Sequence, residues 1–300
     1  MALYEFLGCA IIMYSMIVTL GTLNTPVYLA MMLLAWNVSG GHFNPAITLG
    51  VYISEWKFKD NAVIAGIMFV SQFLGAMLGI LFGFLALVDA SYMNDTENPA
   101  YGPFKSVPPT FLYLLIPVKP SSNGRSIELD FANGEDDSDW TRDWQTFWGI
   151  FLATTFLTLV FVSVKSKHTA ISEDKLAQCF LIVLALNVVS TLCAKFGGAA
   201  SAAVLIDQTA QQNTEPVASA NFNPALASAS ILWVQAQYSL DSDIEDQVHV
   251  NRAINHYLWA YMIAPLVGGV VGGILHKLHA KVTAGDNVDG DDGKEESLLT

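Results

Sequence analysis

The feature that most constrains this fold is a set of long apolar runs with almost no charge inside them. The chain has 300 residues, of which 53% are hydrophobic and only 14% are charged, whereas soluble domains carry roughly 25% charged residues. Several runs approach the ~20 residues that a membrane-spanning helix needs. A soluble helical protein seldom needs several uncharged runs of that length, so the sequence predicts an all-α membrane protein. The six expected spans cover about residues 3–19, 25–38, 62–88, 146–164, 176–194 and 256–275.

Two short segments between these spans share the triplet Asn-Pro-Ala. The triplets are Asn44, Pro45 and Ala46 in the first half of the chain, and Asn223, Pro224 and Ala225 in the second. Asn is a strong helix N-cap, and Pro is favoured at the first helical position because its missing N–H would be unpaired there anyway. Each triplet is therefore expected to start a short re-entrant helix, over 44–53 and 223–233. Two such interruptions at corresponding places in two halves of a membrane protein indicate a transport site.

The Lys residues near the ends of the apolar runs determine the expected orientation. They cluster after the second span, after the fourth span and after the sixth. Positively charged loops face the cytoplasm, so both termini are expected there. The first short helix then enters from the cytoplasmic side and the second from the opposite side. The sequence therefore predicts an inverted repeat, with its first copy over 1–88 and its second over 146–276.

Two acidic stretches lie outside these repeats. Residues 89–145 hold ten acidic residues against four Lys or Arg, and residues 281–300 hold six acidic residues against two Lys. We expect a long exoplasmic loop over 89–145 and a cytoplasmic tail over 277–300. Both are expected to be solvated, and nucleic acid is not an expected partner of a chain with a net charge of −13.

The two short helices are expected to meet end to end near the membrane midplane. A helix N-terminus carries roughly half a positive elementary charge, so two facing N-termini make a zone that opposes cations and protons. Asn44 and Asn223 can each cap their own helix and still offer side-chain N–H donors. Water that turns its oxygen towards those donors would interrupt a proton wire.

With these residues in view, the chain resembles the aquaporin, or major intrinsic protein, family. Residues 39–50 are similar to the family's first-half motif, residues 5–8 to the start of its first span, and Gln72 and residues 259–269 to parts of its third and sixth spans. The resemblance implies a six-span, right-handed bundle with two half-helices, assembled as a homotetramer in the lipid bilayer. It also implies passive, osmotically driven flow of water, sometimes of glycerol or other small neutral solutes.

The resemblance further suggests roles for two residues near the first triplet. The family's counterpart of Glu5 braces the loop before the first half-helix. The counterpart of His42 lines the cytoplasmic vestibule, where a hydrogen-bonding role is expected and a pH-sensing role is the alternative. The usual fourth-span partner of Glu5 is absent, because Ile150 or Phe151 stands at that position.

Departures from the family pattern fall at the outer selectivity filter. The family usually has Arg three residues after the second Asn, where this chain has Leu226. Counting from the triplets places Asn24 and Ala220 at two other filter positions, and Val189 or Ser190 is the candidate in the fifth span. These residues predict a wider, more apolar outer constriction. Ala227, where glycerol-conducting relatives have Asp, favours the water-type branch weakly.

Two rival hypotheses come from other classes of protein. One is a non-conducting membrane scaffold or junction protein on the same fold, which Leu226 and the lost fourth-span Glu leave open. The other is a secondary transporter, which shares inverted repeats and broken helices but needs a coupling-ion site, and Glu5 is the one acidic residue clearly inside a span. The sequence shows no nucleophile–base pair, and its three Cys lack metal spacing. We therefore expect neither an enzyme nor a bound cofactor or metal.

Overall fold

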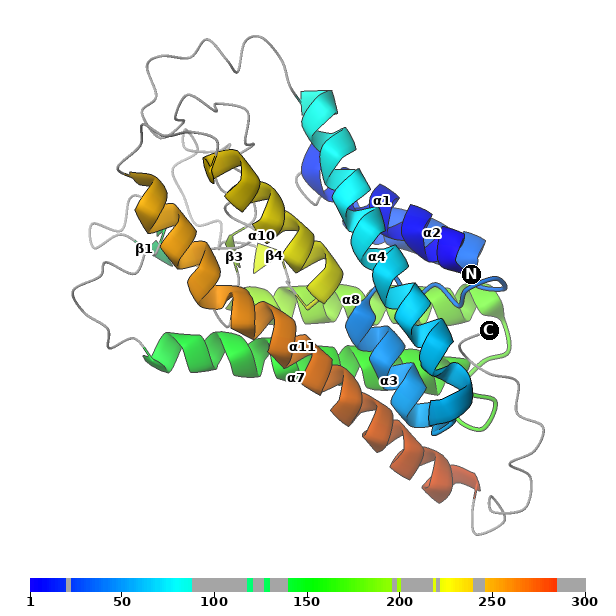
Figure 1. Cartoon of the computed structure of the whole chain (residues 1–300). Coiled ribbons are helices and arrows are strands. Elements are labelled where there is room, and N and C mark those ends of the chain that lie inside the picture. The colour runs from blue at the N-terminus through cyan, green and yellow to red at the C-terminus, as the bar shows by residue number, and fades with distance from the viewer. Residues whose placement is uncertain are drawn as a thin grey trace.

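The structure, a computed structural model, is built almost entirely of helices (Figure 1). It describes residues 1–19, 23–87, 118–120, 127–129, 140–195, 199–200, 218–219, 222–239 and 246–284. The helices are α1 (Ala2–Val18), α2 (Asn24–Ala35), α3 (Pro45–Glu55), α4 (Phe58–Leu87), α7 (Trp140–Lys165), α8 (Lys175–Lys195), α10 (Pro224–Ser239) and α11 (Asp246–Ala284). Every expected span and both expected short helices correspond to one of these helices, which confirms the predicted fold class.

Several boundaries differ from the sequence-based expectation. Helix α7 begins at Trp140 instead of residue 146, and α11 begins at Asp246 and continues to Ala284, well beyond the expected 256–275. Apolar runs mark the part of a helix that lies in lipid, and a polar helix can continue beyond it. Helix α2 ends earlier, at Ala35, because the Ala35 carbonyl accepts bonds from the N–H groups of Val38, Ser39 and Gly40, which turn the chain out of the helix.

Among the residues that the structure describes, four short strands are the exception to the helical fold. Strands β1 (Val118–Pro120) and β2 (Ile127–Leu129) pair antiparallel, with Val118 opposite Leu129. Strands β3 (Ala199–Ala200) and β4 (Ala218–Ser219) form a second antiparallel pair. Of the expected loop over 89–145, the described residues form β1, β2 and the first turns of α7, and its exoplasmic location stays a prediction.

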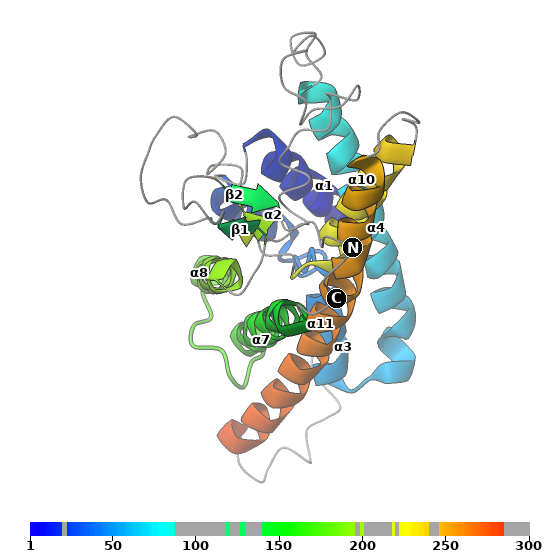
Figure 2. The same ribbon diagram turned by 90° about the vertical axis from the view of Figure 1, so that its left-hand side faces the viewer.

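The same set of helix pairs occurs in both halves of the chain. Helix α4 packs against α1, and α11 packs against α7, which it crosses at an angle (Figure 1). Each short helix packs on the long helix of the other half, α3 against α11 and α10 against α4, and it also contacts the long helix of its own half. Figure 2 shows α7 and α8 nearly end-on, with α11 crossing α7. This exchange places both short helices between the long ones.

Glycines on the two longest helices allow this close packing. A Cβ added to Gly75 or Gly79 of α4 would overlap the carbonyl oxygens of Phe6 and Ala10 on α1. On α11, a Cβ at Gly268 would lie 2.7 Å from the Phe151 carbonyl oxygen, and one at Gly272 would lie 2.8 Å from that of Thr155. Small residues at such positions let helix backbones approach closely in membranes.

A neighbouring pair of glycines receives the first short helix. A Cβ at Gly269 or Gly273 of α11 would overlap the carbonyl oxygens of Ala46 and Gly50 on α3. One face of α11 therefore packs on α7 and the next holds α3, so the position of the first Asn-Pro-Ala triplet depends on α11.

The outer surfaces of the long helices carry large apolar side chains. Val63 and Val70 of α4 and Leu152 of α7 are each at least 59% exposed. In the described part of the chain, three stretches are long and apolar enough to cross a bilayer, namely Phe58–Ala86, Thr146–Lys165 and Leu258–Thr283. Continuous apolar outer faces of this kind suit lipid acyl chains.

Replacing Gly75 with Ala should separate α1 from α4. The added methyl group meets the Phe6 backbone, which cannot move without shifting the helix, and overpacking of this kind costs about 1–3 kcal/mol. Gly66 is a matched control on the same helix, because a Cβ there has nothing within 4 Å. We expect G75A to lower the thermal unfolding midpoint in detergent and G66A to leave it unchanged or raise it. Equal midpoints for the two variants would contradict the packing described here.

Candidate functional site

Both Asn-Pro-Ala triplets begin helices. The Asn44 side-chain Oδ1 accepts a hydrogen bond from the Ala46 N–H at 2.8 Å, with Asn44 in an extended conformation at φ −153°. The Asn223 Oδ1 accepts from the Ala225 N–H at 3.1 Å in the same way. In both helices the Pro follows directly, where its lack of an N–H costs nothing. The triplets thus form two capped helix starts, at α3 and α10.

The two helix starts are joined by a reciprocal pair of hydrogen bonds. The Asn44 Nδ2 donates to the Phe222 carbonyl at 3.1 Å, and the Asn223 Nδ2 donates to the Phe43 carbonyl at 2.7 Å. Each Asn side chain therefore caps its own helix and holds the residue that precedes the other helix. Asn44 is 0% exposed and Asn223 is 4% exposed. We call this arrangement the Asn44–Asn223 junction.

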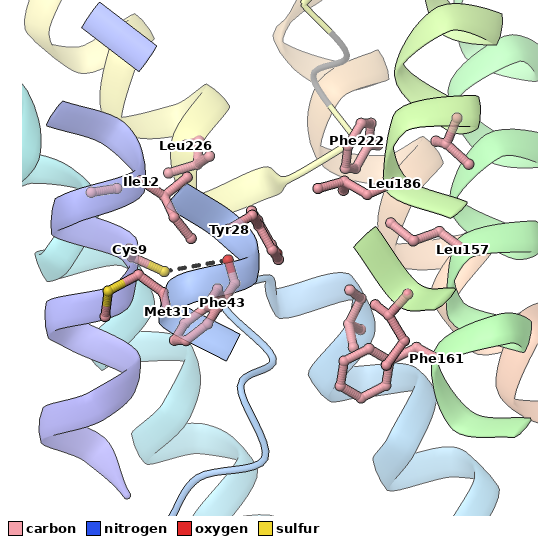
Figure 3. Packing of buried hydrophobic residues seen from close by; sticks show 14 of the residues in the cluster. Cys9, Ile12, Tyr28, Met31, Phe43, Leu157, Phe161, Leu186, Phe222 and Leu226 are labelled. Carbon is pink, nitrogen blue, oxygen red and sulfur yellow. Dashed lines mark hydrogen bonds between the residues drawn. The ribbon is translucent and has the colours of Figure 1, made fainter. Parts of the chain in front are cut away.

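Phe43 connects the junction to helix α1. Its backbone has a positive φ of 49°, which is uncommon for a bulky residue. Its ring packs where a Cβ on Gly8 would otherwise stand, and its carbonyl also accepts a bond from the Cys9 thiol at 3.3 Å (Figure 3). This carbonyl is thus held from two directions, by Asn223 and by Cys9.

Glu5 holds the chain segment that leads into α3. Its Oε1 accepts from the Ser39 hydroxyl at 2.7 Å and the His42 N–H at 3.0 Å, and its Oε2 accepts from the Phe43 N–H at 2.7 Å and the Gln72 amide at 2.8 Å. An ionised carboxylate offers about four lone-pair positions. All of them are used, and every partner is a donor, so a carboxylate fits this buried site without an unmet bond.

The position of His42 is fixed by its neighbours on three helices. Its Nδ1 lies 3.2 Å from the Thr48 Oγ1, its carbonyl accepts from the Tyr28 hydroxyl at 3.4 Å, and its ring meets the Phe161 ring edge-on at 5.2 Å. The Thr48 hydroxyl donates to the Asn44 carbonyl at 3.1 Å. With that bond in place, the Thr48 oxygen accepts from the His42 Nδ1 as well as from the Gln72 amide at 2.9 Å, which corresponds to a ring that carries a proton on Nδ1.

The four expected filter residues fall in different places. Leu226, in the first turn of α10, and Val189 of α8 are buried in one apolar cluster. Asn24 is half-buried at the first residue of α2, and its Oδ1 is buried without a hydrogen-bond partner among the described residues. Ala220 lies outside the described residues. The structure thus places Leu226 and Val189 in one cluster and leaves the assignment of the complete filter a prediction.

Figure 3 shows that cluster as two groups of apolar side chains. One group contains Leu226, Ile12, Cys9, Met31, Tyr28 and Phe43, and the other contains Phe222, Leu186, Leu157 and Phe161. Leu226 lies near Ile12 of α1. The first turn of α10 therefore presents an apolar side chain at the position where the aquaporin family usually has a positively charged Arg.

Among the described residues, the second half shows no counterpart of the Glu5 brace. The glycine contacts align the halves, because Gly75 meets Phe6 as Gly268 meets Phe151. The counterpart of Glu5 is then Ile150, one residue before Phe151, which decides between the two candidates from the sequence. Ile150 is buried and apolar, so it cannot accept hydrogen bonds from the chain before α10.

Sequence reasoning did not single out two contributors to this region. Cys9 was noted only for its lack of metal spacing, and Lys165 only as part of a positively charged loop, yet Lys165 contacts the segment before α3 through the Gly40 carbonyl. No local signal marks either residue, since both contacts join distant parts of the chain. Among the described residues, no group of three or more His, Cys, Asp or Glu gathers to hold a metal ion.

Three comparisons place this geometry among known proteins. The family model of the major intrinsic protein matches residues 21–276. No curated protein sequence matches the chain significantly. Among solved structures, the fold is similar to the X-ray structure of the aquaglyceroporin from Plasmodium falciparum, with a TM-score of 0.55 and 17% sequence identity over 92% of this chain and 94% of that one.

Replacing Glu5 with Gln should loosen the segment before α3. The new amide nitrogen would face donors, so two of the four present donors lose their acceptor, and each buried donor left unpaired costs about 1–3 kcal/mol. We expect E5Q to lower the thermal unfolding midpoint clearly more than S39A, which removes only one of the four bonds. Equal effects of E5Q and S39A would mean that Glu5 does not organise this segment.

Proposed function

We propose a function from one premise, which is that the chain belongs to the major intrinsic protein family and is an integral membrane protein. The proposed function is a passive transmembrane channel for water and small neutral solutes such as glycerol, urea or ammonia. The path runs past the Asn44–Asn223 junction, and the protein is not an enzyme.

The observation that carries this proposal is the reciprocal bonding of Asn44 and Asn223. A side-chain amide has two N–H donors, and in each Asn one of them is used on the carbonyl opposite. The second N–H of each Asn is then free to bind the oxygen of a passing molecule. Because the first bond fixes the amide plane, these donors are pre-oriented towards the path at no further cost in conformational freedom.

The same junction supports the exclusion of cations and protons. Helices α3 and α10 begin there, and each N-terminus contributes roughly half a positive elementary charge. A cation would meet this field after losing water, whereas a neutral solute pays no comparable penalty. A water molecule bound through its oxygen to both Asn side chains cannot accept a proton along the file.

The residues around the junction receive roles within this proposal. Asn24, Val189, Ala220 and Leu226 form the outer filter, His42 lines the inner vestibule, and Glu5 braces the segment before α3. At an effective dielectric constant of ~20, a unit charge ~4 Å away is worth ~4 kcal/mol. Leu226 provides no such charge and is shorter than Arg, so the outer filter rejects cations less strongly and is wide enough for solutes larger than water.

The topology and assembly are part of the same proposal. The chain forms an inverted repeat of residues 1–88 and 146–276, with both termini in the cytoplasm, and it assembles as a homotetramer with one pore per subunit. The shared helix pairing of the two halves supports the repeat. The exposed apolar faces of α4 and α7 provide surface for lipid and for neighbouring subunits.

A second candidate is a non-conducting scaffold on the same fold. It is favoured by Ile150, which stands where the first half has Glu5 and provides no carboxylate that could hold the chain before α10 along an open path. The two functions differ in osmotic permeability.

The proposal is tested by stopped-flow shrinkage of proteoliposomes that hold the purified protein. We expect shrinkage in an impermeant osmolyte to be faster than that of empty liposomes, and glycerol and urea to enter as well. L226R should reduce glycerol and urea entry more than water flow, because a guanidinium both narrows the filter and adds charge. L226M is the matched control, since it keeps the volume and the lack of charge.

Two outcomes contradict parts of this account. Wild-type liposomes that shrink no faster than empty ones, with an intact oligomer, would support the scaffold. A wild-type channel that passes water and excludes glycerol and urea would refute the wide outer filter.

A further inference from the structure

Lys165, the last residue of α7, directs its ammonium group into the protein. The Nζ donates to the Gly40 carbonyl at 2.8 Å, and it lies 4.6 Å from the centre of the Trp36 ring and 5.2 Å from that of Phe161. Lys at the end of a membrane helix usually extends outward to the interface. Lys167, two residues further on, has an exposed side chain. Lys165 therefore departs from the usual behaviour of a span-end Lys.

The two aromatic rings select a charged group at this position. A neutral donor could satisfy the Gly40 carbonyl equally well, but the faces of Trp and Phe attract a cation specifically. Phe161 is fully buried and also contacts the His42 ring. The ammonium group is thus held beside His42 by a ring that touches both residues.

Gly40 provides the space for this arrangement. Its φ of +82° disfavours any side chain, and a Cβ there would lie 2.5 Å from the Lys165 Nζ and 3.1 Å from the His42 Nε2. The two nitrogen atoms therefore converge on one point next to the Gly40 backbone. Gly40 precedes Asn44 by four residues, so it lies within about 14 Å of the junction at full chain extension.

We propose that Lys165 is a charge-selectivity residue, whose fixed ammonium group repels cations in the inner vestibule beside His42 before they reach the Asn44–Asn223 junction. This inference rests on the proposed channel function. It places a full positive charge in the inner vestibule, where α7 ends. On the other side of the junction, the first turn of α10 carries the uncharged Leu226. The two helix N-termini add only partial charges, so Lys165 is a major part of the barrier to cations.

The test compares four variants in the same proteoliposomes. K165Q keeps a hydrogen-bond donor and removes the charge, K165M removes both, and K165R keeps both. K167Q is the matched control, because it removes one charge two residues away on an exposed side chain. Each preparation is measured twice, once for osmotic shrinkage and once for entry of Tl⁺, which quenches an enclosed fluorescent dye.

We expect K165Q and K165M to raise Tl⁺ entry relative to water flow by about tenfold or more. The repulsion energy between two unit charges a few ångströms apart is larger than the free-energy difference that corresponds to a tenfold change in an equilibrium constant. K165R and K167Q should retain the wild-type ratio. The two neutral variants differ in hydrogen bonding, so if one of them folds poorly, the other still tests the effect of the charge.

The outcomes separate this inference from the proposed function. Wild-type liposomes without osmotic permeability refute both. Normal osmotic flow with unchanged Tl⁺ exclusion in K165Q and K165M overturns the role of Lys165 alone. A leak in K165M that K165Q does not share also overturns it, because the hydrogen bond and not the charge would then be responsible.

Discussion

The structure depends most on the exchange of hydrogen bonds between Asn44 and Asn223. Each side chain begins one short helix and holds the carbonyl before the other. This exchange opposes the repulsion between the two helix N-termini, which carry like partial charges. The bonds offset that repulsion and fix the donors in one orientation. Within the proposed function, these bonds orient the donors for neutral oxygen atoms, and the junction and Lys165 together form the barrier to cations.

The rest of the fold brings the two helix starts to one place. Gly269 and Gly273 of α11 receive α3 from the other half of the chain, and Gly75 and Gly79 of α4 hold α1. Helix α1 in turn supplies Glu5, which positions the segment before α3 through four bonds. The glycines thus act on the site at a distance, since any side chain there would displace a helix that carries a site residue.

The sequence predicted the helices and the two capped starts well, because apolar runs and the Asn-Pro pair are local signals. It could not predict the ends of α7 and α11, since hydrophobicity marks the membrane and not the helix. It also missed Lys165, which meets Gly40 across 125 positions in the chain. The sequence left two candidates, Ile150 and Phe151, for the second-half position that corresponds to Glu5. The glycine contacts, which align the two halves, identify it as Ile150.

The central claim is that solutes pass the Asn44–Asn223 junction, and the most direct measurement is the Tl⁺ and water permeability of N223D in proteoliposomes. An Asp side chain can still cap α10 but loses the donor to Phe43 and places a negative charge in the positive zone. The account predicts that N223D still conducts water and admits Tl⁺. Normal water flow with no rise in Tl⁺ entry, both in N223D alone and in N223D combined with K165Q, would show that the path does not pass this junction.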